Sequence, residues 1–199
     1  METDIIRPNK LYRYSEKKWL ERSLTLGEFR LRPASDYNTV ENDTARQDNE
    51  LLRIRKSPAS SIIIENVRTG ERTRPIGDVV YRSETGTNYL TICFSKQWDL
   101  QLFKVFSGTD SCLVVHNVEE FSERLHLAVE KKLIEWVGMD ASIVYGGNSE
   151  LGAVFSKPLH YIFQHEWRFA WSPITPVTNL EPLTVSIGNI ENIAEIIES

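Results

Sequence analysis

The stretch from Tyr161 to Trp171 constrains the fold of this chain more than any other part of the sequence. If it forms a strand, successive side chains point to opposite faces. One face then carries the aromatic set Phe163, His165, Trp167, Phe169 and Trp171, and the other carries Ile162, Gln164, Glu166 and Arg168. The aromatic face predicts packing on a hydrophobic core. The opposite face places an amide, a carboxylate and a guanidinium in a row, which either lies in water or lines a cleft.

The length and composition predict one globular domain over residues 1–199, because the chain has 199 residues, 41% of them hydrophobic, and five tryptophans. There is no run of about 18 apolar residues, so no membrane-spanning helix is expected. The first eight residues lack the apolar core of a signal peptide. Cys93 and Cys112 lie in apolar, strand-like runs, which predicts two buried free thiols. We therefore expect a cytoplasmic protein.

The charge of the chain is unevenly distributed. The net charge of −5 argues against a non-specific nucleic-acid binder. Residues 1–82 hold 16 Lys and Arg against 13 Asp and Glu, a net of +3, and the remainder holds 7 against 15, a net of −8. The mildly basic first part either faces phosphate groups or is solvated surface.

Local patterns predict more strands than helices. Strands are expected at 10–14, 28–32, 61–67, 79–81, 88–95, 111–116, 141–145, 161–171 and 183–187. Helices are expected at 16–26, closed by Gly27, at 98–106, and at 118–136 after the capping residue Asn117. Segment 61–67 is predicted to form a hairpin with the strand at 79–81, 34–60 is a helix or a long loop, and 190–197 is a helix or a strand. Helices do not alternate with strands, so we predict an α+β fold with a mainly antiparallel sheet and flanking helices.

Common catalytic motifs are missing. The sequence has no glycine-rich nucleotide loop after a strand, no Walker-type Gly-Lys-Ser and no Gly-x-Ser-x-Gly. Four scattered histidines and no Cys-x-x-Cys give no spacing typical of a metal site, so no metal ligands are assigned. A Cys–His dyad is disfavoured because both cysteines are expected in the core.

A dispersed set of polar residues remains. Arg13 lies in the first strand, Ser95 ends a buried strand, and Gln164 and Glu166 share a face of the late strand. One class of ADP-ribosyltransferases uses an arginine, a serine and a Gln-x-Glu in this order. An arginine grips the pyrophosphate of NAD bidentately. A carboxylate stabilises the positive charge that develops when the nicotinamide–ribose bond breaks, a serine orients that carboxylate, and the glutamine positions the acceptor.

Structural interpretations stand beside this hypothesis. Glu166 and Arg168 also fit an ion pair or a solvated strand face. Arg13 fits a surface residue or a partner for Glu166, and Ser95 fits an ordinary strand-ending serine. Lys157 is expected to face solvent.

Short motifs in a fixed order resemble a large family of uncharacterised bacterial proteins related to the AbiGi-type abortive-infection proteins. The motifs are Leu11–Tyr14, Phe29–Leu31 with Ser35–Asn38, Cys93–Ser95, Lys157, Glu166–Arg168 and Ile187–Ile193. The chain departs from the family where Thr39-Val40 replaces Asp-Pro after Asn38, and where Gln164-His165-Glu166 replaces Glu-x-Glu. The resemblance implies a phage-defence context. With Tyr37 from the second motif, the predicted cofactor-binding set is Arg13, Tyr37, Ser95 and Arg168.

The sequence leaves three candidate functions. The first is an ADP-ribosyltransferase-like enzyme with a split β-sandwich that uses NAD to modify a macromolecule, with Glu166 and Gln164 as catalytic residues. The second is a non-enzymatic binding or immunity module of a defence or toxin–antitoxin pair, which implies a protein partner. The third is a hydrolase in which Glu166 and the loop carboxylates Asp36, Glu41, Asp43 and Asp48 hold Mg²⁺.

Overall fold

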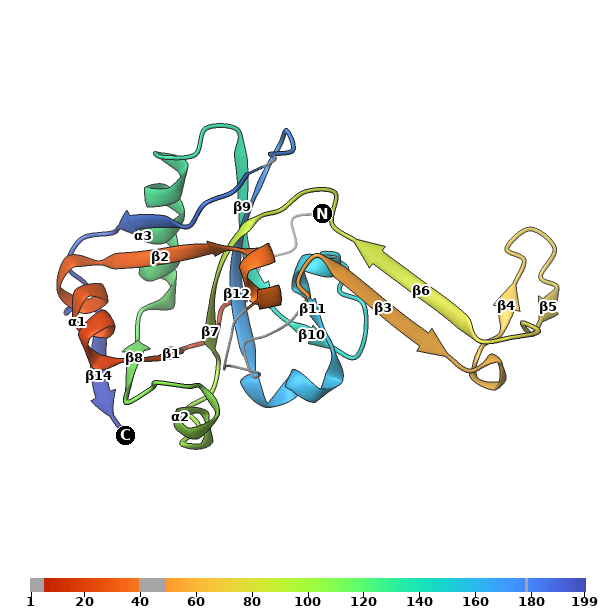
Figure 1. Cartoon of the computed structure of the whole chain (residues 1–199), viewed down its shortest axis with the longest axis horizontal. Helices are drawn as coiled ribbons and strands as arrows, with labels where there is room; N and C mark the ends of the chain where they lie inside the picture. The colour runs from red at the N-terminus through yellow and green to blue at the C-terminus, as the bar shows by residue number, and fades with distance from the viewer. Residues whose placement is uncertain (1–5, 40–48, 178) are drawn as a thin grey trace.

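Eight antiparallel strands form the central sheet of the computed structural model, which describes residues 6–39, 49–177 and 179–199 (Figure 1). In spatial order, six of them are β13 (Leu183–Ser186), β2 (Glu28–Pro33), β7 (Leu90–Ser95), β1 (Leu11–Ser15), β8 (Ser111–Val115) and β14 (Ala194–Glu198). The other two, β12 (Glu166–Pro173) and β9 (Trp136–Ser142), extend the sheet from β7. The predicted α+β fold is confirmed, and the undecided segment 190–197 ends as a strand.

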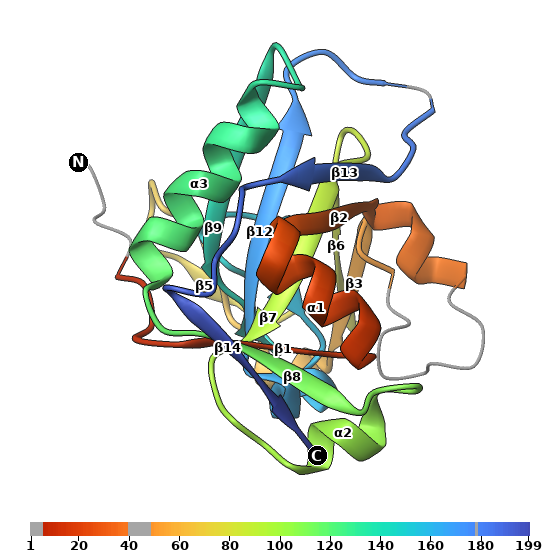
Figure 2. The same ribbon diagram turned by 90° about the vertical axis from the view of Figure 1, so that its left-hand side faces the viewer.

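Two helices cover one face of this sheet, as Figure 2 shows: α1 (Lys17–Leu26) and α3 (Val118–Glu130). The Asn117 side chain caps α3 by accepting from the Glu120 amide at 3.2 Å, as its sequence position predicts. Trp167, Phe169 and Trp171 of β12 are buried in the core beneath these helices. Trp167, Phe169 and Trp171 are therefore core, as expected, whereas Phe163 and His165 of the predicted aromatic face are only partly buried.

The sheet divides along one edge of β7. On one side, β12 pairs with the whole of β7, from Leu90 to Ser95. On the other side, β2 pairs only with Leu90 and Thr91, and β1 only with Ser95. The edge of β7 between these two contacts is therefore open in the described chain, and the open length is called the split below. Backbone groups at a sheet edge need other partners, so a split is a natural ligand-binding position.

A long two-stranded ribbon projects from the body (Figure 1) and is called the arm, residues 52–84. Its strands are β3 (Leu52–Ser57) and β6 (Val79–Glu84), with the small hairpin β4 (Ile64–Glu65) and β5 (Arg72–Thr73) at the tip. The predicted pairing of 61–67 with 79–81 is therefore wrong, because β3 is the partner of β6. Most arm side chains face solvent, so the sequence shows no regular alternation there.

The opening stretch also differs from its prediction. Leu159–Gln164 form a 3₁₀ helix, η4, and the backbone of His165 is left-handed with φ 44°, so β12 begins only at Glu166. Gln164 and His165 are thus not part of the strand. The predicted helix 118–136 ends at Glu130, because Trp136 onward joins the sheet as β9.

The remaining elements are short. They are α2 (Gln101–Val105), β10 (Val144–Tyr145), β11 (Ser156–Lys157), η1 (Ala34–Thr39), η2 (Ala59–Ser61) and η3 (Ala153–Phe155). Within the described ranges, no helix is both long and apolar enough to cross a membrane.

Candidate functional site

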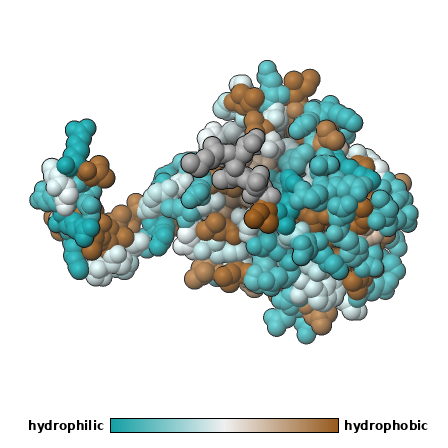
Figure 3. All heavy atoms as spheres, turned by 180° about the vertical axis from the view of Figure 1, so that it is seen from behind, coloured by the Kyte–Doolittle hydropathy of each residue, from teal (hydrophilic) through white to brown (hydrophobic). Residues whose placement is uncertain are grey.

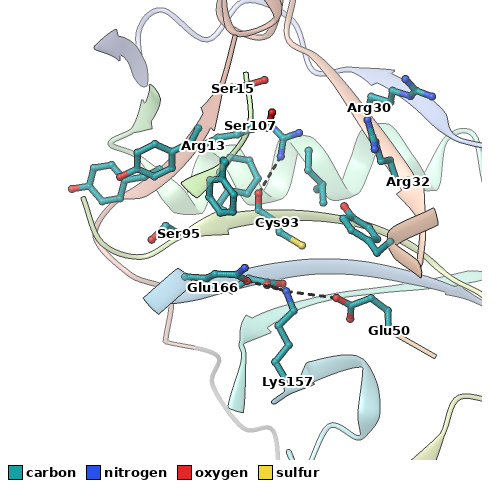
Figure 4. Close-up of a pocket in the computed structure, with 17 residues that line it drawn as sticks. Arg13, Ser15, Arg30, Arg32, Glu50, Cys93, Ser95, Ser107, Lys157 and Glu166 are labelled. Carbon is teal, nitrogen blue, oxygen red and sulfur yellow. Dashed lines mark hydrogen bonds and ion pairs between the residues drawn. The ribbon is translucent and has the colours of Figure 1, made fainter. Parts of the chain in front are cut away.

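A cleft of about 390 Å³ opens at the split between β1 and β2 (Figure 4). Polar lining side chains come from distant parts of the chain and include Arg13, Arg30, Arg32, Tyr37, Glu50, Ser95, Lys157, Gln164 and Glu166. Aromatic rings of Tyr12, Tyr14, Phe94 and Phe106 complete the wall. A concave site of this volume, with apolar rings and a few convergent polar groups, is typical of small-molecule binding sites.

Arg13 bridges the split. Its guanidinium donates to the backbone carbonyl of Cys93 at 3.0 Å and lies 5.6 Å from the ring centroid of Phe94. Cys93 is in the open part of β7, and among the described residues neither β1 nor β2 pairs with it. Arg13 therefore supplies the missing hydrogen bond and places a positive charge in the middle of the cleft.

Glu166 lies on the floor of the cleft and is paired with two cations. Its Oε2 lies 2.7 Å from Lys157 Nζ, and its Oε1 lies 2.7 Å from Arg168 Nε. All three residues are buried: Glu166 is 3% exposed, Lys157 6% and Arg168 0%. The predicted ion pair between Glu166 and Arg168 is present, and the expectation that Lys157 faces solvent is wrong.

Glu50 completes this buried charge cluster. Its carboxylate accepts two hydrogen bonds from Arg168, at 2.5 and 2.9 Å, and lies 3.6 Å from Lys157 Nζ. Arg53 at the base of the arm also donates to Glu50, at 3.1 Å. Buried charges are tolerated when they are paired and hydrogen-bonded in this way. Arg168 lies beneath the cleft wall and supports it.

The cluster fixes the ionisation of the cleft floor. Burial disfavours the charged form of Glu166, but the nearby Arg168 and Lys157 outweigh it and lower the pKa of this carboxyl below its ordinary range. Burial likewise opposes the charge of Lys157, but Glu166 and Glu50 raise the pKa of this amine above its ordinary value. At neutral pH, the floor therefore holds an anionic glutamate and a cationic lysine.

The other predicted residues also line the cleft, in different roles. The Ser95 hydroxyl donates to the Gln97 carbonyl at 2.8 Å, so Lys157 and Arg168 orient the Glu166 carboxylate in its place. Gln164, although in η4, reaches the floor, where its Oε1 accepts from Lys157 at 2.9 Å. Tyr37 lies in η1, and burial raises the pKa of its phenol above the ordinary value, which keeps it neutral.

Sequence reasoning missed several lining residues. Glu50 follows a polar stretch with no pattern, and its partner Arg168 is 118 positions away. Arg30 and Arg32 alternate with core residues on β2. That alternation in the sequence indicates that both arginines lie on the face opposite the core. Cys93 is free, as expected, but it is only partly buried and lines the cleft, so only Cys112 is core.

The hydrolase hypothesis gains no support from the described part of the chain. There, no group of three or more His, Cys, Asp or Glu side chains is arranged to hold a metal ion. Asp36 lies in η1, whereas Glu41, Asp43 and Asp48 are outside the described residues.

No protein-family model, curated protein or solved structure matches this chain. The resemblance to abortive-infection proteins stays a prediction. The geometry of the cleft is what bears on function.

Proposed function

We propose that the cleft binds NAD and that the protein is an ADP-ribosyltransferase-like enzyme that modifies a macromolecule. The observation that supports this most is that Arg13 and Glu166, 153 positions apart in the sequence, line one cleft on either side of β7. A cation and an ionised carboxylate at opposite sides of a pocket are the groups that NAD chemistry needs. The resemblance to abortive-infection proteins makes phage defence the proposed setting.

Arg13 is assigned to the pyrophosphate. A guanidinium offers paired donors that match phosphate oxygens, and its positive charge offsets theirs. The contact to the Cys93 carbonyl holds the Arg13 side chain across the split, so little side-chain entropy is lost when the ligand binds. The rings of Tyr12 and Phe106 offer faces on which a base stacks.

Glu166 is assigned to the reacting ribose. The bond between the ribose and nicotinamide breaks with its electron pair leaving on nicotinamide, which departs as a neutral molecule. The ribose then carries positive charge, which an adjacent carboxylate stabilises. The acceptor's lone pair forms the new bond to the ribose carbon, and its proton passes to solvent. Gln164, beside Glu166 on the floor, is assigned to positioning that acceptor.

The contacts of Glu166 set a condition on this role. Lys157 and Arg168 occupy one oxygen each, so the ribose must approach the carboxylate from the open side of the cleft. The same two cations keep Glu166 ionised, which is the form that stabilises positive charge. The low pKa therefore suits a stabilising carboxylate better than a proton donor.

The test is incubation of the purified protein with NAD labelled in the adenylate part, with and without cell extract. We expect label transfer to a macromolecule, release of nicotinamide, and a higher melting temperature with NAD. Glu166→Gln is expected to abolish turnover, and circular dichroism reports whether it folds. Glu150→Gln, at an exposed position, is the matched control and is expected to turn over normally. Absence of transfer, of release and of thermal stabilisation would reject the proposal.

A second candidate is a non-enzymatic binding or immunity module, and the arm favours it. Several of its large apolar side chains face solvent (Figure 3), among them Val67 at 96% exposure and Ile76, fully exposed. Contiguous exposed apolar side chains commonly mark protein-interaction surfaces. The test compares the whole chain with a variant in which a short Gly-Ser loop replaces residues 58–78. A stoichiometric protein partner retained only by the whole chain, with no NAD turnover, would favour this candidate over the enzyme.

A further inference from the structure

Two arginines at the β2 end of the cleft have no role in the function proposed above. We infer that Arg30 and Arg32 bind a phosphate on the adenosine ribose, so that the cleft prefers NADP to NAD. This inference rests on the proposed dinucleotide function and specifies its substrate.

The two side chains belong to one wall. Arg30 and Arg32 are two positions apart on β2, so they leave the strand on the same face, while Phe29 and Leu31 point into the core. Both line the cleft and both are exposed. Figure 4 shows them together at one end, apart from Arg13 and Glu166.

In the described part of the chain, no acidic side chain pairs with either arginine. By contrast, Arg7, Arg53 and Arg168 each contact an aspartate or glutamate. Two neighbouring guanidinium groups repel each other unless an anion lies between them, so this wall is suited to a doubly charged phosphate.

The cleft groups follow the direction of β7. Arg32 is opposite Thr91, Arg13 contacts the carbonyl of Cys93, and Glu166 is opposite Ser95. With a rise of about 3.3 Å per residue, Thr91 and Ser95 are about 13 Å apart, and Cys93 is midway. A dinucleotide lying along the split would place its reacting ribose at Glu166 and its pyrophosphate at Arg13. The adenosine ribose then reaches Arg30 and Arg32.

Tyr37 also lines the cleft. Burial raises the pKa of its phenol overall, although the charges of Arg13 and Arg32 act to lower it. Because the phenol is neutral, it is able to donate a hydrogen bond to a phosphate oxygen. A ligand phosphate at the β2 end would therefore meet two guanidinium groups and one hydroxyl.

The test is calorimetric titration of the whole chain with NADP and with NAD at about 150 mM salt, where weak surface attraction is screened. We expect NADP to bind at least about tenfold more tightly, as a single charge-assisted contact provides. The double variant Arg30→Gln/Arg32→Gln should bring the ratio close to one and leave NAD affinity within about twofold. Titration with adenosine 2′-phosphate and with adenosine 5′-phosphate repeats the comparison with ligands that lack the reacting end. The wild-type chain should prefer the 2′-phosphate, and the double variant should lose this preference.

The matched control is Arg55→Gln/Arg74→Gln. These two arginines are also exposed and lack an ion pair among the described residues, but they lie in the arm. This control should keep the full preference for NADP. If it loses that preference, the effect comes from the net charge of the protein and the inference is overturned. Equal affinity of the wild-type chain for NAD and NADP overturns the inference and leaves the proposed function standing. If neither dinucleotide binds, both fail.

Discussion

Lys157 Nζ lies 2.7 Å from Oε2 of Glu166, and neither side chain is more than a few per cent exposed. The two charges neutralise each other where water is largely excluded. Removing one of them leaves the other buried with one counter-ion fewer, which is more costly than losing a surface pair. This relationship makes the floor of the cleft important for folding as well as for the proposed ligand binding.

We expect Lys157→Met to lower the free energy of unfolding by about 3 kcal/mol, because the buried Oε2 of Glu166 and Oε1 of Gln164 both lose the donor that they share. Urea unfolding at pH 7 measures this change. Lys104→Met, at an exposed position on α2, is the matched control and should stay within about 0.5 kcal/mol of wild type. A Lys157→Met protein as stable as this control would mean that the ion pair is not formed in solution.

Protonation of Asp140 should contribute to the loss of stability at low pH. Burial opposes its ionisation, but hydrogen bonds from Arg7 and His126 outweigh that effect and lower the pKa of Asp140 to about 2. A carboxyl whose pKa is depressed by folding stabilises the protein above its unfolded value, near 3.9, and loses that contribution as pH falls towards 2. Asp140→Asn should therefore be about 2 kcal/mol less stable at pH 7, and the difference from wild type should narrow between pH 4 and pH 2.

Unfolding titrations from pH 2 to pH 7 follow this narrowing. Asp78→Asn, in an exposed pair with Lys56, serves as the control and should show a difference that hardly depends on pH. A constant difference for Asp140→Asn across the same range would contradict the assignment.

Cys93 should be chemically quiet even though it lines the cleft. Burial raises the pKa of this thiol to about 12, so very little thiolate is present at pH 8. Alkylation by iodoacetamide should be at least about tenfold slower than for an unperturbed cysteine, as judged by mass spectrometry. Both cysteines should label readily in concentrated urea. Rapid labelling of Cys93 in the folded protein would show that its thiolate is accessible.

Gly27 should tolerate no side chain. Its backbone is left-handed, with φ 63°, and a Cβ atom there would lie 2.0 Å from the backbone oxygen of Gly188. Gly27→Ala should therefore cost at least about 2 kcal/mol, from the backbone conformation and the clash together. Gly86→Ala is the control, because Gly86 has open space around it and no positive φ, and it should change stability by no more than about 0.5 kcal/mol. Thermal melts of the two variants decide the comparison.

The regular part of the fold was predictable because each buried strand carries its own pattern. The aromatic alternation of Trp167, Phe169 and Trp171, the cap at Asn117 and the glycine at 27 are local signals, and each has its expected place. The same reasoning failed for residues 161–165, because the 3₁₀ helix η4 and the left-handed backbone of His165 delay the start of β12 to Glu166.

The site was predictable only in part. Arg13, Tyr37, Ser95, Gln164 and Glu166 line one cleft, whereas Arg168 supports it from beneath. Glu50 and Lys157 were not foreseeable, because Glu50 lies in a turn and Lys157 in a two-residue strand, and neither element leaves a periodic signal. The pairing of the arm was misjudged for a similar reason, since side chains in water are under no pressure to alternate.

The arm should unfold locally without unfolding of the central sheet. A two-stranded ribbon without a core is only marginally stable on its own, so its amides should exchange with solvent through local fraying while the central sheet stays closed. Amides at the base of the arm should exchange more slowly, because Arg53 donates to the Ser156 carbonyl at 2.8 Å and to Glu50. Cleavage or fluorophore labelling at the tip should therefore affect the arm alone and leave the central sheet folded. A substitution at Arg53 should instead disturb the buried charges under the cleft.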